Sequence, residues 1–138
     1  MLRRSPIARK TPLRSGGFLR RAVAKVRRRN TGPDRATRLV VWERSGGMCE
    51  MAHGCNAMAV DVHHRKPRRS GGTKDPLVNS PANLLAICRA GHNWVESNRM
   101  EALLQGLLLH STEQPRGVPV VLRYGLVHLT HDGQWEAA

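Results

Sequence analysis

Charge is distributed so unevenly along this chain that only part of it can fold around a core. Residues 1–33 contain eleven Lys or Arg and no acidic residue, whereas residues 34–138 contain twelve basic and ten acidic residues. The first segment also mixes Pro, Gly and Ser with like charges, so it buries too little apolar surface to offset the loss of chain entropy on folding. We therefore expect a disordered basic arm over residues 1–33 and one small folded domain after it.

The formal net charge of +13 predicts a polyanionic partner, either nucleic acid or an anionic membrane. The arm lacks the apolar face of a membrane-surface helix, which favours the phosphates of nucleic acid. A solubilising tail and a membrane-surface segment remain the alternatives. No apolar run approaches membrane-spanning length and no secretory signal is visible, so we expect no membrane partner and a soluble, cytoplasmic protein.

The hydrophobic pattern of residues 34–138 predicts an α+β fold. Asp34 can cap a helix that Gly46 and Gly47 end, and AMAVDVHH over residues 57–64 alternates like a half-buried strand. Residues 65–83 are rich in Pro, Gly, Ser and Asn and predict a loop. A helix is expected over residues 90–109 and one or two strands over residues 118–135, which places a β extension at residues 110–138.

The three cysteines are an odd number, which argues against a disulfide framework in a reducing compartment. Metal ligation is the better use of these thiols, because a small core with few aromatic residues often needs a metal to stabilise it. Buried free cysteines that simply pack are the alternative.

Histidines recur at spacings that suit a catalytic metal site. His63 and His64 end the predicted strand, where successive side chains point to opposite faces. Asn83 follows the loop, and His92 and Glu96 lie four residues apart on one face of the next helix. Each feature is weak alone, and a solvated helix face explains Glu96 equally well. The order His-His, Asn, His around a basic Gly-Gly loop makes the combination more specific.

Over residues 38–100 this arrangement resembles the HNH endonuclease family. The family pattern is a cysteine pair, a strand ending in an acidic or His residue followed by His, a Gly-Gly loop, Asn-Leu, and a Cys-x-x-Cys-His helix start. The matching residues are Cys49 and Cys55, DVHHRKPRRSGG, Asn83-Leu84-Leu85, and Cys88 with His92. The basic arm and the C-terminal segment resemble small phage-encoded members found beside packaging genes. That likeness implies packaging proteins such as terminase as partners and the host cytoplasm as location.

The resemblance implies a ββα-metal domain over residues 34–109 that hydrolyses DNA phosphodiester bonds. By position, His64 would be the general base, because imidazole can take a proton from water near neutral pH. His63 and His92 would bind one divalent metal ion, which could be Mg, Mn, Ni or Zn, and Glu96 would complete or orient the site. The ion would neutralise the scissile phosphate and stabilise the departing 3′ oxygen.

Other residues of the motif would position the loop and the substrate. Asn83 would hold the loop through backbone hydrogen bonds, with a helix-cap or turn role as the alternative. The basic residues after the histidine pair would hold flanking phosphates. They are Arg65, Lys66, Arg68 and Arg69.

The chain departs from the family at the cysteines. Relatives with structural zinc use four cysteines, but Gly91 stands where the fourth is expected. Zinc bound by three thiols and His53 is one hypothesis, and thiols that only pack is the other. The thiols of the first hypothesis are Cys49, Cys55 and Cys88. His92 could also be drawn into such a zinc site, which would put its catalytic role in doubt.

Two further functions are compatible with the sequence. A non-catalytic, zinc-stabilised nucleic-acid-binding protein would use Cys and His structurally and bind through the arm. Such a binding protein does not need a general base such as His64 next to a metal ligand, so the presence of His64 favours the nuclease. The other is an RNA-binding or accessory packaging protein, but the chain lacks the interleaved aromatic residues expected for base stacking.

Overall fold

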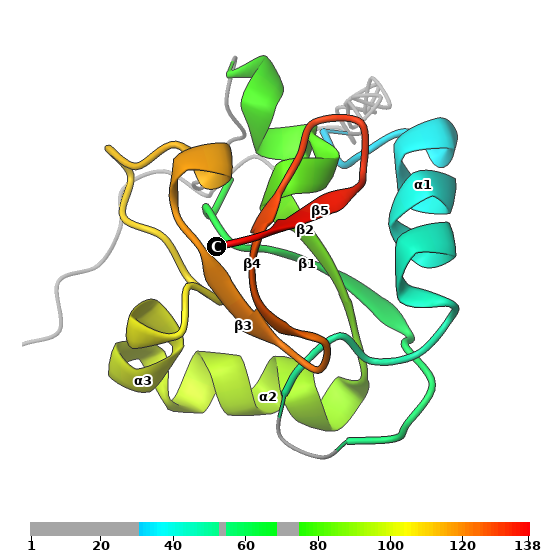
Figure 1. The fold of residues 1–138 in the computed structure, drawn as a ribbon, viewed down its shortest axis with the longest axis vertical. Coiled ribbons are helices and arrows are strands. Elements are labelled where there is room, and N and C mark those ends of the chain that lie inside the picture. The colour runs from blue at the N-terminus through cyan, green and yellow to red at the C-terminus, as the bar shows by residue number, and fades with distance from the viewer. Residues whose placement is uncertain (1–30, 53–54, 69–74) are drawn as a thin grey trace, which may run out of the picture.

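The computed structural model describes residues 31–52, 55–68 and 75–138 (Figure 1). Most of the predicted arm, together with His53 and Arg69, lies outside these residues. The described part is a small mixed α+β domain, as predicted, with three α-helices, three 3-10 helices and two small sheets. The α-helices are α1 (Arg35–Ser45), α2 (Arg89–Ser97) and α3 (Arg99–Leu104), and the 3-10 helices are η1 (Pro76–Asn79), η2 (Pro81–Asn83) and η3 (Pro115–Gly117). The strands are β1 (Asp61–His64), β2 (Leu84–Ile87), β3 (Val120–Leu122), β4 (Gly125–Leu129) and β5 (Trp135–Ala137).

Helix α1 begins and ends where the sequence predicts. The Asp34 carboxylate accepts a hydrogen bond of 2.7 Å from the Thr37 amide, which satisfies one free N–H of the first turn. Gly46 ends the helix in the left-handed conformation, with φ of 60°, that favours glycine. None of the helices described has the length and apolar character needed to cross a membrane.

Strands β1 and β2 form an antiparallel hairpin in which His63 pairs with Leu85 and His64 with Leu84. Strand β1 is shorter than predicted, because the two-residue period breaks before it. Ala59 and Val62 are three residues apart, yet both pack against the cluster under α1. The apolar residues Met58 and Val60 are 72% and 57% exposed, so the predicted half-buried strand does not extend over this part of residues 57–64.

Strand β2 is buried on both faces and is the centre of the fold. Leu84 and Ala86 pack toward α1, whereas Leu85 and Ile87 belong to the larger core. Figure 1 shows the hairpin running between α1 and α2, with the C-terminal strands across it. Helix α2 follows β2 directly, so its first turn lies close to the β1–β2 pair.

The single helix predicted over residues 90–109 is two short helices. Asn98 departs from helical geometry between them, and its side-chain amide donates to the Trp94 carbonyl at 2.9 Å. Helix α3 ends before Gly106, whose φ is 70°. A β-carbon there would lie 2.1 Å from the Pro119 carbonyl oxygen, so close backbone packing requires glycine. Residues 107–109 are buried and are not helical.

The C-terminal segment forms a three-stranded antiparallel sheet in the order β3-β4-β5, one strand more than the maximum predicted. It joins the rest of the domain by backbone hydrogen bonds of 2.9 Å, from Arg123 to Glu50 and from Val121 to Gln105. Its buried residues Val127 and Leu129 belong to the same core as the inner face of α2.

Arg65 does not hold a phosphate at the surface, and this prediction is wrong. Its side chain is completely buried and donates five hydrogen bonds to backbone carbonyls. The acceptors belong to Ala82, Gly106, Pro115, Val118 and Pro119. Burial lowers the pKa of Arg65 to about 10, so the guanidinium is still charged at neutral pH and matches the carbonyl dipoles around it.

We expect Arg65→Met to destabilise the protein by at least about 3 kcal/mol, because five buried carbonyls lose a charged donor at once. Urea unfolding of the full chain measures the change. Arg116→Met is the matched control, because Arg116 lies on the surface of η3, and it should leave the unfolding midpoint unchanged. Equal midpoints for both variants would contradict the structural role of Arg65.

Candidate metal centre

Strand β1 and helix α2 bring two histidine rings together. His63 and Asp61 share the face of β1 that points toward α2, because alternate strand residues point the same way. The ring centroids of His63 and His92 are 5.3 Å apart in an edge-to-face arrangement. The Asp61 carboxylate lies 3.2 Å from Nδ1 of His92. The predicted meeting of His63 and His92 therefore occurs.

His63 is held in the state that a metal ion requires. Its Nε2 donates to the Leu107 carbonyl at 3.0 Å, which leaves Nδ1 with its lone pair. Burial lowers the pKa of His63 to about 4, so the ring is neutral at physiological pH. A neutral imidazole with one nitrogen fixed by a backbone carbonyl is a common arrangement for a metal ligand.

The second ring, His92, is oriented by a carboxylate. Nδ1 of His92 donates to Asp61, so Nε2 is left to face a metal ion. The Asp61 carboxylate also forms an ion pair with the Arg89 guanidinium, with an N to O distance of 2.9 Å. Asp61 was not predicted as a site residue, although it lies two residues before His63 and therefore on the same face of the strand.

Glu96 lies one turn after His92 on α2 and completes a cluster of three. One ligand atom from each of His63, His92 and Glu96 lies within 4.8 Å of the other two. These are distances that a single ion can bridge with small side-chain movements. Glu96 is exposed and also forms an ion pair of 3.1 Å with Arg99, so it can approach the histidines or stay at the surface.

The side chain of His64 points away from this cluster, to the other face of β1. Its Nε2 lies 3.0 Å from the amide oxygen of Asn79, and the Asn79 amide nitrogen donates to the Thr31 carbonyl. Because the amide oxygen accepts, the proton is on Nε2 and Nδ1 is free to take another. Burial lowers the pKa of His64, which favours this neutral form. Asn79 was not predicted; it ends η1, fifteen residues after His64 in the sequence.

A basic cavity of about 240 Å³ opens beside His64. Two guanidinium groups line it, Arg38 from α1 and Arg68 from the segment after β1, and none of the acidic residues in the described part of the chain does so. The remaining lining residues are Gly32, Pro33 and Val62. Arg38 was overlooked in the sequence because α1 looked like a packing helix alone, but it brings positive charge to the same cavity as the predicted Arg68.

Asn83 clamps the segment that leaves β1. Its buried side chain accepts a 2.7 Å hydrogen bond from the Lys66 amide and donates to the carbonyls of Lys66 and Val78. These are the backbone contacts that the loop-holding prediction requires. The Lys66 ammonium is mostly buried and lies 3.5 Å from Asp75, so its charge is already partly neutralised.

Three thiols form a second cluster on another side of α2. The Sγ atoms of Cys49, Cys55 and Cys88 lie within 4.8 Å of one another, and all three cysteines are free. Cys88 caps α2 through a 3.2 Å hydrogen bond from the Gly91 amide. Both clusters have the chemistry of a metal site, and His92 belongs to the histidine cluster rather than to the thiols.

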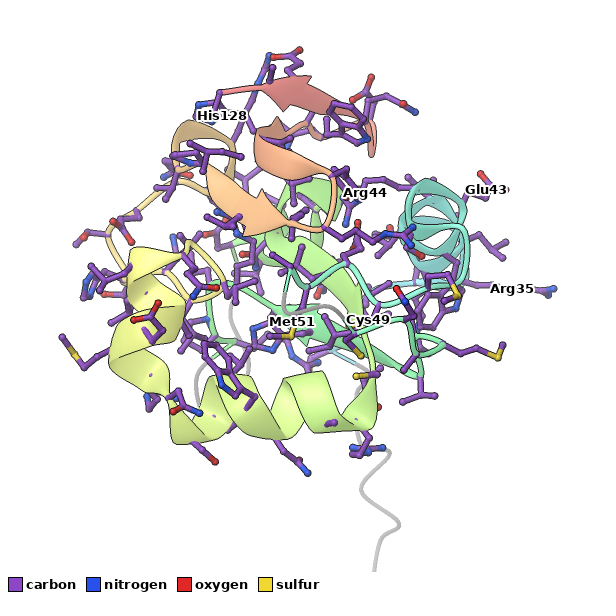
Figure 2. The ribbon with its side chains drawn as sticks, turned by 60° about the horizontal axis from the view of Figure 1, so that its bottom comes forward. Arg35, Glu43, Arg44, Cys49, Met51 and His128 are labelled. Carbon is purple, nitrogen blue, oxygen red and sulfur yellow. The ribbon has the colours of Figure 1, made fainter. Side chains whose placement is uncertain are left out.

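We expect His92→Ala to weaken the binding of a divalent ion such as Mn²⁺ or Ni²⁺ by tenfold or more, because it removes one of the few ligands of the site. Calorimetric titration of the full chain measures the affinity. His128→Ala is the matched control, since His128 lies in β4, well away from α2 (Figure 2). Equal affinities for wild type and His92→Ala would exclude this cluster as the binding site.

Comparisons with protein-family models, with curated proteins and with solved structures find no match to this chain. The chemistry of the site is therefore inferred from its own residues. His63 is neutral and hydrogen-bonded to a carbonyl, and His92 is hydrogen-bonded to a carboxylate. Glu96 lies one turn after His92, and His64 lies beside a cavity lined by two arginines.

Proposed function

We propose that this protein is a metal-dependent DNA endonuclease of the HNH type. The observation that carries the proposal is the pair of adjacent histidines with different surroundings. His63 faces His92 and Glu96 in a group that could hold an ion, and His64 faces a cavity lined by arginines. Adjacent residues on a strand can thus serve a metal ion and a substrate phosphate at the same time.

The order of elements supports this proposal. The hairpin β1–β2 is followed at once by α2, and the candidate ligands come from the first strand and from the helix. This is the order that a ββα-metal domain requires. Leu85 of the hairpin and Val95 of α2 pack in the same core. This packing keeps the face of β1 with His63 turned toward the face of α2 with His92.

The chain's own residues supply the steps of hydrolysis. A bound divalent ion would neutralise charge on the scissile phosphate and stabilise the leaving 3′ oxygen. Nδ1 of His64 takes a proton from water, whose oxygen then forms the new bond to phosphorus. The bond from phosphorus to the 3′ oxygen breaks, and that oxygen takes a proton from solvent. The products are a 5′-phosphate and a 3′-hydroxyl.

Positive charge supports DNA as the substrate. Arg38 and Arg68 border the cavity at His64, where they can hold a phosphate beside the base. The basic arm of residues 1–33 joins the domain at this place, because Gly32 and Pro33 line the same cavity. A role in phage DNA processing or packaging, with terminase-like partners in the host cytoplasm, fits this proposal.

We expect His64→Ala to reduce the cleavage rate by about a hundredfold or more while leaving metal affinity nearly intact, because a positioned general base contributes about 10²–10⁴ to the rate. His63→Ala should instead weaken metal binding and recover part of its activity at high metal concentration. Plasmid cleavage and calorimetric metal titration on both variants measure these effects.

The two variants distinguish the possible errors. Loss of metal binding in His64→Ala with retention in His63→Ala would mean that the roles are reversed. Wild-type cleavage by both variants would exclude the nuclease mechanism.

We further expect Arg38→Gln to weaken binding of a short DNA duplex and to lower the salt dependence of its affinity by about one unit of log–log slope, since one phosphate contact is lost. Arg35→Gln is the matched control, because Arg35 lies on the same helix and points away from the domain (Figure 2). Fluorescence anisotropy at several salt concentrations measures both slopes. Equal slopes for the two variants would contradict a phosphate contact at Arg38.

A non-catalytic, metal-stabilised nucleic-acid-binding protein is the second candidate. The thiol cluster of Cys49, Cys55 and Cys88 favours it, because such a group can stabilise a small fold without catalysis. That protein would bind DNA but leave plasmids intact with every divalent ion, which the cleavage assay above detects.

A further inference from the structure

Helix α2 contributes residues to two chemically different clusters. Cys88, at the N-cap, and Gly91 face the thiols, whereas His92 and Glu96 face β1. Figure 2 shows Cys49 and Met51 on the segment that passes over α2 on the thiol side. The thiol cluster is therefore a site in its own right, and its properties do not depend on the proposed nuclease function.

The three thiols are close enough to share one metal ion. A zinc ion with sulfur ligands at about 2.3 Å in tetrahedral geometry separates those sulfurs by about 3.8 Å. The Sγ atoms of Cys55 and Cys88 are 3.2 Å apart, and all three thiols lie within 4.8 Å of one another. Small side-chain rotations bring them to the required spacing, so three ligands of a tetrahedral site fit.

The fourth ligand does not come from residue 91. A β-carbon added to Gly91 would lie 3.4 Å from Sγ of Cys88 and 3.6 Å from Sγ of Cys49, so a cysteine there would reach the cluster. The same β-carbon would lie 2.6 Å from Sδ of Met51, which is almost completely buried. The thioether of Met51 thus occupies the space of the missing side chain, and a structural site with four cysteines does not fit this chain.

A cavity of about 230 Å³ adjoins the cluster where the fourth ligand would enter. Its lining is mainly apolar and consists of Met51, Cys55, Ala90, Gly91 and Trp94. Three thiolates around a divalent ion already carry one net negative charge. An apolar cavity disfavours a second negative charge, so a neutral donor such as water or imidazole is the ligand that suits this position.

We propose that Cys49, Cys55 and Cys88 bind a zinc-class ion through three thiolates. Its fourth position, to which the described residues contribute no side chain, is open to an exchangeable neutral ligand. The open position faces the cavity beside Gly91 and Trp94. Sites closed by four protein ligands are structural, whereas an open position lets small molecules reach the ion. This chain would therefore combine stabilisation of the α2 N-terminus with an accessible metal ion.

Cobalt(II) is the probe that tests the proposal, because its sulfur charge-transfer band reports thiolates and not the histidine cluster. The full-length protein should show a tetrahedral spectrum with the intensity of three thiolates, and added imidazole should shift its visible bands. Cys55→Ser should lower the charge-transfer intensity by about a third, since one of three thiolates is lost. Cys55 is only partly buried, so this variant keeps the core packing.

The double variant Met51→Ala/Gly91→Cys removes the blocking thioether and adds a fourth thiol. We expect its charge-transfer intensity to rise by about a third and its spectrum to become insensitive to imidazole. Gly117→Cys is the matched control, because nothing lies within 4 Å of a β-carbon at Gly117. This variant has the same number of thiols but should keep the wild-type spectrum and its imidazole response.

Three results would overturn the proposal. They are a wild-type protein with no charge-transfer band, a wild-type spectrum that imidazole leaves unchanged, and a His53→Ala variant whose spectrum differs from wild type. The last would show that a protein side chain fills the fourth position. Since every readout is spectroscopic, a failure of the nuclease proposal leaves these outcomes unaffected.

Discussion

The buried guanidinium of Arg65 is the interaction on which the rest of the domain depends. It directly follows the two histidines of β1 and donates to carbonyls from three separate segments, at Ala82, at Gly106 and in residues 115–119. The guanidinium charge is tolerated away from solvent because each of its N–H groups donates to a carbonyl oxygen. The end of β1 is thereby held against the turn after α3 and the start of the C-terminal sheet, and His63 meets the Leu107 carbonyl in consequence.

A second buried charge connects the other half of the molecule. Arg44 of α1 forms an ion pair of 2.8 Å with Glu50, which also accepts hydrogen bonds from the Tyr124 hydroxyl and the Ala86 amide. Removing one partner of such a pair leaves an uncompensated charge, which is strongly destabilising. The pair therefore fixes how α1, the segment of Cys49 to Met51, β2 and the C-terminal sheet meet. As a result, α1 packs on one face of the β1–β2 hairpin and α2 lies on the other.

Because of this packing, the two faces of β1 lie in chemically different surroundings. The face of β1 with His63 lies against α2, with His92 and Glu96, while the face with His64 lies against α1 and the cavity with Arg38. The N-terminal turn of α2 adds a third environment at Cys88. Two candidate metal-binding clusters and a basic cavity can coexist in so small a domain, because strand and helix periodicities direct neighbouring residues to different sides.

Local rules in the sequence were sufficient for the cap at Asp34, the end of α1 at Gly46, and the approach of His63 to His92, because each depends on spacing within one element or on a recognisable motif. The same rules misplaced Arg65, whose charge predicted a surface position. They also overlooked Asn79 and Arg38. Those roles come from contacts between segments far apart in the chain, and only the packing of β1 against α1, α3 and the C-terminal sheet decided which basic residue is buried and which faces the cavity.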